Sequence, residues 1–260
     1  FMSAFQIRIS RRSFLQAAGL TALAGGLAAC GSTAQSTAPS ASAPAYSMED
    51  AVKAEFTDSG ITLSPENASG CTVEGTALTI TAAGTYAVSG SCADGSIQIR
   101  KGTEDVTLVL NGLTLTSTTT APLVCGKSSG VTLAAAEGTE NTLTDGEANN
   151  KDNANASEDA ESAVVKCKDG SQVVLCGTGT LNLHAVGKNG IKSGTTEEDR
   201  DASLTIRALT LNIDASVNDA INAEQQLNVE SGTLNIAAGD DAVHCDLYLN
   251  VGAEGTDGPT

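Results

Sequence analysis

The chain has 260 residues, with 14 Lys and Arg against 31 Asp and Glu and a formal net charge of −17. This balance argues against a nucleic-acid partner, and it opposes acidic polymers unless a divalent cation lies between the two. With no Trp, three Tyr and four Phe, the core must rest on Leu, Ile, Val, Ala and Thr, which suit layered strands better than crossing helices.

Residues 1–30 have the features of an export signal. Arg11 and Arg12 form a twin-arginine motif, and the apolar run that follows at 17–29 is too short to span a bilayer. The run ends in Leu-Ala-Ala followed by Cys30, an order that resembles a bacterial lipobox. The sequence predicts an exported protein, lipid-anchored through Cys30 to the outer face of the cell membrane. A plain secretory signal with an incidental Cys30 is the alternative.

Residues 31–47 are rich in Ser, Ala and Pro and cannot bury a core, so they are predicted to form a flexible tether. Residues 48–260 are predicted to form one domain, which is long enough to bury a core of its own. The first strands of this domain, at 78–80, 86–88 and 97–99, are alternating but irregular in spacing. Within the longer run at 106–115, Asn111-Gly112 suits either a hairpin or a corner between stacked strands, and the repeats downstream favour the corner.

A polar insertion follows at 146–161. It contains Asn, Asp, Glu, Ser and Ala but no large apolar residue. The sequence predicts a protruding loop without core residues, which a cation or ligand would order.

A repeat in the second half of the chain decides the fold class. Thr-Leu-Asn-Leu at 180–183 recurs in similar form at 210–213 and 233–236, at spacings of 30 (210−180) and 23 (233−210) residues. Strand-like triplets before and after this tetrapeptide keep the same phase, so each unit holds three short strands separated by turns. This pattern predicts an all-β solenoid, a parallel β-helix with irregular N-terminal strands, in which units stack about 4.8 Å apart. A β-sandwich would not give three copies of one tetrapeptide in register.

Small residues are expected inside the solenoid where the third strand of each unit turns. Cys167, Ser193, Ala223 and Cys245 occupy this place in successive units. The chain stops at Thr260 without an obvious cap, which predicts a truncated gene product, because a solenoid needs both ends covered.

Six cysteines remain after Cys30, and an even set in an exported protein predicts disulfides. Cys71 and Cys92 flank one strand pair and are the best candidates for a bridge, with buried free thiols as the alternative for the others. A zinc site is not expected, because the sequence has no Cys-x-x-Cys and only two histidines, His184 and His244.

The turns between strands hold carboxylates at repeated positions. Asn218-Asp219 and Asp240-Asp241 are equivalent in phase, so stacking should bring Asp219 and Asp241 together. Such carboxylates repel each other, and a hard cation that prefers oxygen ligands would relieve the repulsion. The simpler interpretation is that Asp and Asn favour turns. His244 is expected to be a surface residue and not a ligand. The candidate calcium ligands are Asn189, Asp214, Asn218, Asp219, Asp240 and Asp241.

Three runs, at 61–90, 106–112 and 239–244, resemble a family of bacterial surface proteins, the carbohydrate-binding-domain lipoproteins first recognised in cellulose-degrading clostridia. The likeness covers about residues 59–252, and the chain departs from the pattern by its extra cysteines and early end. The resemblance implies a right-handed parallel β-helix similar to that of pectate lyases. It also implies bound calcium and an affinity for cellulose-like or pectin-like polysaccharides, with lyase activity not the established role of the family.

These features predict a non-catalytic, calcium-dependent polysaccharide-binding protein, monomeric, with no nucleic-acid partner. Lacking aromatic platforms, the protein would hold a glycan by hydrogen bonds along a flat strand face, and calcium would bridge to uronate carboxylates. Two alternatives stay open. One is a uronate lyase in which calcium acidifies a proton that a basic side chain removes; the basic candidates are Lys166, Lys168, Lys188, Lys192 and Arg207. The other is a structural or adhesive solenoid without a glycan ligand.

Overall fold

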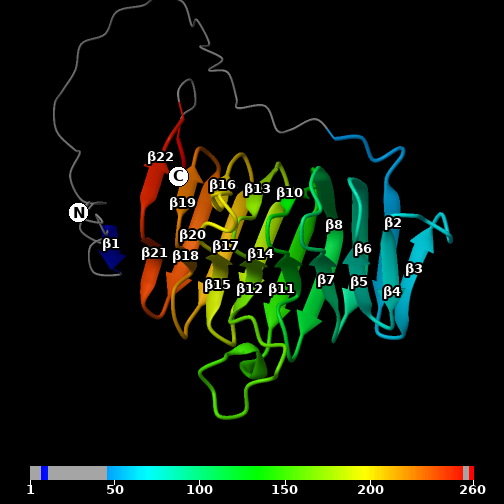
Figure 1. Cartoon of the computed structure of the whole chain (residues 1–260), viewed down its shortest axis with the longest axis horizontal. Helices are drawn as coiled ribbons and strands as arrows, with labels where there is room; N and C mark the ends of the chain where they lie inside the picture. The colour runs from blue at the N-terminus through cyan, green and yellow to red at the C-terminus, as the bar shows by residue number, and fades with distance from the viewer. Residues whose placement is uncertain (1–6, 11–45, 254–257) are drawn as a thin grey trace, which may run out of the picture.

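The computed structural model describes residues 7–10, 46–253 and 258–260 (Figure 1). The predicted lipid-attachment site Cys30, the twin arginines and the tether up to residue 45 lie outside the described residues. In the described part of the chain, no helix has the length and apolar character needed to cross a membrane.

The described residues form two β-sheets and one short 3-10 helix, η1 (Glu147–Asn149). The nine-stranded sheet contains β1 (Ile7–Ser10), β4 (Cys71–Glu74), β5 (Ala77–Ile80), β7 (Ser96–Ile99), β9 (Leu123–Cys125), β12 (Ala163–Cys167), β15 (Asn189–Ser193), β18 (Ile221–Ala223) and β21 (Asp241–Cys245). The 13-stranded sheet contains β2 (Val52–Thr57), β3 (Gly60–Ser64), β6 (Gly84–Cys92), β8 (Val106–Ser117), β10 (Gly130–Ala135), β11 (Glu140–Asp145), β13 (Gln172–Gly177), β14 (Thr180–His184), β16 (Ser203–Ile206), β17 (Thr210–Ala215), β19 (Gln226–Val229), β20 (Thr233–Ala238) and β22 (Tyr248–Val251).

The long strand β8 divides the larger sheet into two stacks of parallel strands. Its first part pairs with β10 and its second part with β11. Between the two parts, Gly112 has a φ of 78°, a left-handed conformation that glycine adopts without a steric cost. Asn111-Gly112 is therefore a corner, as predicted, and not a hairpin.

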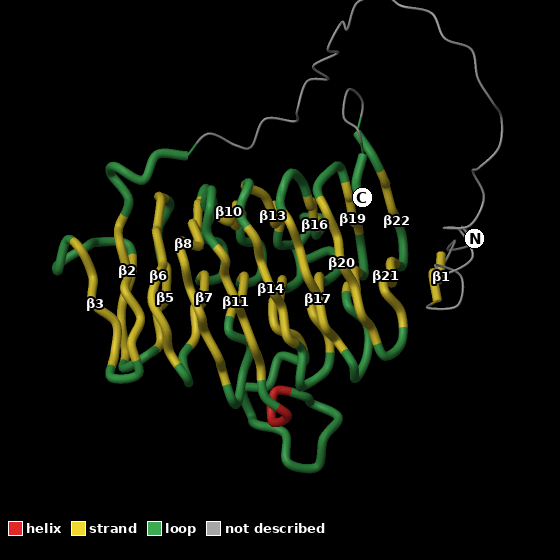
Figure 2. The backbone as a smooth tube through the Cα atoms, turned by 180° about the vertical axis from the view of Figure 1, so that it is seen from behind, coloured by secondary structure: helices red, strands yellow, loops and turns green. Residues whose placement is uncertain are grey.

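Three stacks of parallel strands result. Stack 1 contains the first parts of β6 and β8, then β10, β13, β16, β19 and β22, and stack 2 contains their second parts, then β11, β14, β17 and β20. Stack 3 is the smaller sheet from β5 through β7, β9, β12, β15 and β18 to β21. From β8 on, the chain visits the stacks in the same order in each unit, as the labels in Figures 1 and 2 allow the reader to follow. The predicted all-β, parallel arrangement is confirmed.

Pairing is less regular at the ends. β2 with β3 and β4 with β5 form antiparallel pairs, in agreement with the irregular N-terminal strands that the sequence predicts. β1 pairs antiparallel with β21 at the other end of the smaller sheet. This strand lies within the predicted export signal.

The repeated tetrapeptides lie in register, as predicted. Along stack 2, Leu181 pairs with Leu211 and Leu211 with Leu234, while the neighbouring Asn residues pair in the same way. Leu181 and Leu211 are buried in the core, whereas the Asn side chains point outward and are at least partly exposed. Buried Leu, Ile and Val from all three stacks pack into one continuous core.

The small residues of stack 3 also lie in one column. Cys125, Cys167, Ser193, Ala223 and Cys245 are register partners in successive strands, and all are buried. The column confirms the predicted place for small side chains inside the structure.

All six cysteines of the described domain are free and buried. No bridge joins Cys71 and Cys92, the pair that the sequence favoured. Cys71 belongs to β4 of the smaller sheet, opposite Ile80, whereas Cys92 ends β6 of the larger sheet, opposite Leu115. The two cysteines flank one segment in the sequence, but the chain changes sheets between them, so they are not neighbours in one sheet.

The polar insertion projects from the stacked strands as a loop (Figure 1). Its base is nevertheless buried: the Asn149 amide donates hydrogen bonds to the Asp145 carboxylate at 2.8 Å and the Ala163 carbonyl at 2.9 Å. Asn150 donates to the Gly187 carbonyl at 3.0 Å, and Ala160 is also buried. The expectation of a loop without core residues is therefore wrong, and hydrogen bonds within the chain hold the insertion in place.

The stacked core predicts a strong dependence of stability on its leucine columns. Leu211→Ala, at a fully buried position, should lower the free energy of unfolding by about 2–5 kcal/mol, because the transfer energy is lost and a cavity remains. Leu247→Ala is a matched control at a position that is 44% exposed, and it should cost less than about 1 kcal/mol. Denaturant unfolding measures both. Similar values for the two variants would contradict the stacked core.

Candidate functional site

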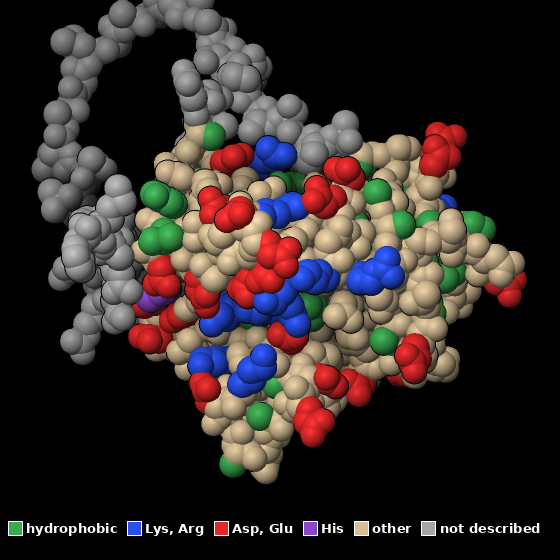
Figure 3. All heavy atoms as spheres, in the orientation of Figure 1, with side chains coloured by type: hydrophobic (Ala, Val, Ile, Leu, Met, Phe, Trp, Pro, Cys, Tyr) green, Lys and Arg blue, Asp and Glu red, His purple; other side chains and the backbone are tan. Residues whose placement is uncertain are grey.

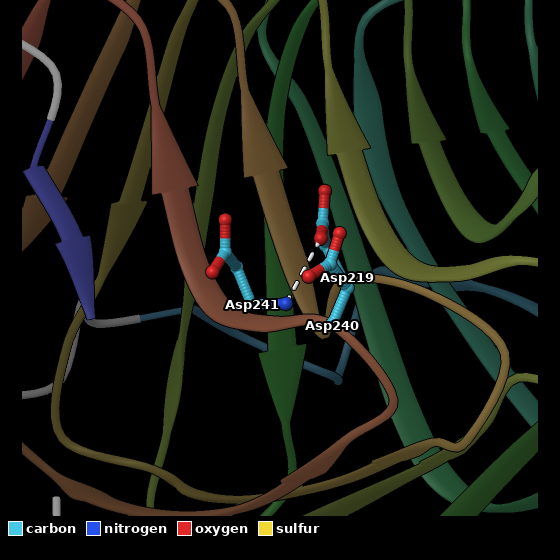
Figure 4. A group of neighbouring side chains, drawn as sticks. All are labelled: Asp219, Asp240 and Asp241. Atoms are coloured by element: carbon cyan, nitrogen blue, oxygen red, sulfur yellow. Dashed lines mark hydrogen bonds between the residues drawn. The ribbon is translucent and has the colours of Figure 1, made fainter. Parts of the chain in front are cut away.

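Three aspartates meet at the turns before β18 and β21. Carboxylate oxygens of Asp219, Asp240 and Asp241 all lie within 4.8 Å of one another. Figure 4 shows the three side chains, which come from two neighbouring turns. The register explains the meeting: Ile221 pairs with Val243, so the residues two positions earlier, Asp219 and Asp241, face each other. Asp219 and Asp241 are buried, whereas Asp240 is exposed. The predicted contact between the two stacked aspartates is confirmed.

Hydrogen bonds within the chain stabilise the negative charge of the buried Asp219 carboxylate only in part. One oxygen of Asp219 accepts a hydrogen bond from the backbone N–H of Asp241 at 3.1 Å, and the other accepts from the Asn222 amide at 2.7 Å. A carboxylate can accept about four hydrogen bonds, so lone pairs remain for another partner. Two buried carboxylates side by side are costly without a nearby positive charge. The arrangement can therefore bind a cation that prefers oxygen.

The remaining predicted ligands divide into a nearby pair and an outlier. Asn189 lies beside Asp219 in the stack, but its amide oxygen accepts a hydrogen bond from Asn218 at 2.8 Å and its amide nitrogen donates to the Ser162 carbonyl at 2.9 Å. These two Asn side chains border the aspartates and bind each other. Asp214 lies in β17, in register with His184 and Ala237 on stack 2, and does not belong to the aspartate cluster.

His244 adjoins the cluster, which sequence reasoning missed. Its Nε2 is 2.8 Å from an Asp246 oxygen, and its Nδ1 is 3.6 Å from an Asp241 oxygen. Burial lowers the pKa of His244, but the hydrogen bond and charge of Asp246, followed by Asp241 and Asp219, outweigh it and raise the pKa above the ordinary value of 6.5. A protonated His244 thus supplies part of the missing positive charge. The spacing of His244 and Asp246, two residues apart on an extended segment, was the available signal, because alternate residues of a strand lie on the same face.

A shallow groove of about 300 Å³ lies on the outward face of stack 2. Its central feature is a column of amides: Asn212 donates to Asn182 at 2.7 Å, and Asn235 donates to Asn212 at 2.8 Å. His184 and Asp214 form the neighbouring column. The groove is lined by Asn182, Leu183, His184, Asn212, Ile213, Asp214, Asn235, Ile236 and Ala237. It presents hydrogen-bond donors and acceptors at regular intervals.

Lysines gather on the outward face of stack 3, where Figure 3 shows Lys and Arg side chains over the middle of this sheet. Lys166 and Lys192 are register partners in β12 and β15. Of the five basic residues considered for proton abstraction, four form ion pairs: Lys168 with Glu161, Lys188 with Asp152, Lys192 with Glu224 and Arg207 with Glu230. Within the described residues, Lys166 forms none, and burial, followed by the charge of Lys192, lowers its pKa.

Two sequence comparisons give the same family description. The sequence profile of a family described as "Carbohydrate-binding domain-containing protein" matches residues 74–252. A protein of Acetivibrio thermocellus with the same description is 28% identical over 144 residues, which make up 55% of this chain and 49% of that protein. The chain thus spans about half the length of the relative that it matches.

A solved structure shows a similar fold. It is described as a polysaccharide lyase-like protein from C. thermocellum, in a gadolinium derivative, and superposes with a TM-score of 0.54 at 24% sequence identity. The match covers 79% of this chain and 98% of that chain. At this identity the likeness concerns the fold alone.

The contacts of His244 predict a pH dependence of stability. A folded-state pKa above 6.5 means that the folded protein binds the proton more tightly, so the stabilisation is complete below 6.5 and is lost as the pH rises through the folded pKa. In calcium-free buffer, His244→Gln should remove this part of the decline, and the exposed His184→Gln should retain it. Denaturant unfolding at several pH values tests the prediction. An unchanged pH profile in His244→Gln would contradict it.

Proposed function

The chain belongs to the family of carbohydrate-binding domain-containing proteins, and from this membership we propose that it is a non-catalytic polysaccharide-binding protein whose three stacks form a right-handed parallel β-helix. The glycan lies along the outward face of stack 2. The observation that carries this proposal is the hydrogen-bonded Asn column in the groove of that face. Cellulose-like and pectin-like polymers are the ligand classes to test.

Amide side chains suit sugar hydroxyls, because each amide has two donors and one oxygen with two lone pairs. The contacts between Asn182, Asn212 and Asn235 use only part of this capacity. Stacked strands place these amides about 4.8 Å apart, so an extended polymer meets the same chemistry at each step. The mutual hydrogen bonds also fix the orientation of the amides before the ligand arrives, which lowers the entropic cost of binding.

Binding takes precedence over a lyase because four of the five basic candidates are held by acidic side chains of the described domain; the fifth, Lys166, whose pKa burial lowers, is the base that the lyase alternative would use. Proton abstraction needs a neutral amine beside the reacting carbon. Lys168, Lys188 and Lys192 are each engaged by a carboxylate of the chain and not by a reacting carbon. Arg207 is paired with Glu230 at 3.7 Å.

We also propose that calcium binds at Asp219, Asp240 and Asp241. These residues fit the ion: three carboxylates converge, two of them are buried, and Asp219 keeps free lone pairs after its two hydrogen bonds. Calcium takes six to eight oxygen ligands, so the cluster would share the ion with water or with a saccharide. A bound calcium would supply the positive charge that the buried carboxylates lack. It would also allow this acidic protein to approach a uronate polymer.

The location of the protein is a further part of the proposal. The twin arginines and Cys30 support export and lipid attachment at the outer face of the cell membrane, with residues 31–47 as the tether. A monomer on such a tether would present its strand faces to polymers outside the cell.

The Asn column can be tested by retention on insoluble cellulose. Asn212→Ala should weaken retention by about threefold to tenfold, since each lost hydrogen bond contributes roughly 0.5–1.5 kcal/mol. Asn250→Ala is the matched control: it removes an exposed Asn that donates to Asn228 at 2.8 Å in the separate column of stack 1. Equal loss in both variants would argue against stack 2 as the glycan face, and no retention of the unmodified protein by any polymer would leave a structural solenoid.

Calcium binding can be measured by titration calorimetry and by retention on polygalacturonate with and without a chelator. The double variant Asp219→Asn with Asp241→Asn should weaken calcium binding by at least about tenfold. Loss of a side chain that only supports a metal ligand already costs about that much, and here two ligands are changed. Asp50→Asn, at an exposed position, should have no effect. Retention that survives chelation would contradict the calcium requirement, and an unsaturated product in the same tubes would favour the lyase.

A further inference from the structure

Two partly buried lysines lie side by side on stack 3, and only one of them has a carboxylate partner among the described residues. Lys166 on β12 and Lys192 on β15 are direct register partners, so their side chains leave the sheet side by side. Parallel strands lie about 4.8 Å apart, which puts two ammonium groups within reach of one small anion. Lys192 has Glu224 at 3.2 Å. Lys166 forms no ion pair with the described part of the chain.

The acidic residues around the pair are engaged with other lysines. Glu161 contacts Lys168 at 2.5 Å and Lys151 at 3.8 Å. Glu224 is the partner of Lys192. Both carboxylates act on Lys166 only through longer-range attraction, which burial and the charge of Lys192 outweigh. A positive charge that is partly removed from water without a partner is unfavourable, and an incoming anion would relieve it.

The polar insertion shapes the surroundings of this pair. Its carboxylates neutralise the flanking lysines, with Asp152 on Lys188 and Glu161 on Lys168. On this part of stack 3, the positive charge without an acidic partner in the described domain is thereby left at Lys166, beside Lys192 with its partner Glu224, within a protein of net charge −17. A long polyanion would meet repulsion outside this spot, whereas a single carboxylate would not.

We propose that Lys166 and Lys192 form a calcium-independent binding site for the carboxylate of an acidic saccharide. Two ammonium groups side by side donate charge-assisted hydrogen bonds to the two oxygens of one carboxylate. The saccharide as carrier of the carboxylate rests on the proposed function, whereas the anion site rests on the lysine geometry. The site lies on stack 3, apart from the Asn column of stack 2.

The test is calorimetric titration of the full chain with a galacturonate trisaccharide in the presence of a chelator, which removes calcium bridging. A neutral galactose trisaccharide and inorganic sulfate are titrated in parallel. The acidic trisaccharide should bind, and Lys166→Gln and Lys192→Gln should each weaken it about tenfold or more, because one charged hydrogen-bond donor is lost. Lys53→Gln on the exposed face of β2 is the matched control and should bind as the unmodified protein does.

Three results would overturn the site: equal binding of acidic and neutral trisaccharides, unchanged affinity in Lys166→Gln, or an equal loss in Lys53→Gln. Sulfate binding as tight as that of the trisaccharide would overturn the saccharide as its ligand. Thermal unfolding shows whether each variant is folded. If Lys166→Gln does not fold, Lys192→Gln provides the test. Retention of the same variants on cellulose, in the presence of calcium, reports on the proposed function independently, since Lys166 and Lys192 lie outside the groove of stack 2.

Discussion

The in-register stacking of parallel strands is the constraint on which the rest of this structure depends. Each unit places its residues directly beside the equivalent residues of the next, at about 4.8 Å. Leu181 therefore meets Leu211 in the core and Asn182 meets Asn212 outside it. The backbone hydrogen bonds between strands fix this order, so the surface inherits the periodicity of the core. A surface of this kind suits a polymer, because both repeat along one direction.

Stacking has opposite consequences for neutral and charged side chains. Amides and apolar groups gain from meeting their own kind, through hydrogen bonds and packing respectively. Carboxylates and ammonium groups lose, because like charges repel. Asp219 with Asp241, and Lys166 with Lys192, are two places in the described strands and turns where the register brings like charges together. Asn222 and His244 contact the aspartate pair, and Glu224 forms an ion pair with one of the two lysines. At both places the charge is only partly compensated, so an external ion of opposite charge can still bind.

The sequence predicts the parts of the fold that repeat with constant phase. The tetrapeptides, the corner at Gly112 and the meeting of Asp219 with Asp241 follow from short, regular spacings. The lysine pair follows from the same phase, because Lys166 and Lys192 immediately precede the equivalent residues Cys167 and Ser193. The length of a unit is harder to predict where a turn is extended: Val131 and Val173 are register partners 42 residues apart (173−131), with the insertion between them. Asp214 does not join the cluster of Asp219, Asp240 and Asp241, because it lies within β17 and not in the turn that follows this strand. The cysteines could not be paired from sequence because disulfide geometry depends on which sheet each strand joins.

The most direct test of this account is a crystal structure of the protein with calcium and a bound cello-oligosaccharide. The account predicts sugar rings in the groove of stack 2, with hydroxyl groups within hydrogen-bond distance of Asn182, Asn212 and Asn235, and an ion among Asp219, Asp240 and Asp241. A saccharide on another face, with the Asn column exposed to solvent, would contradict the claim that the stacked amides form the glycan-binding surface.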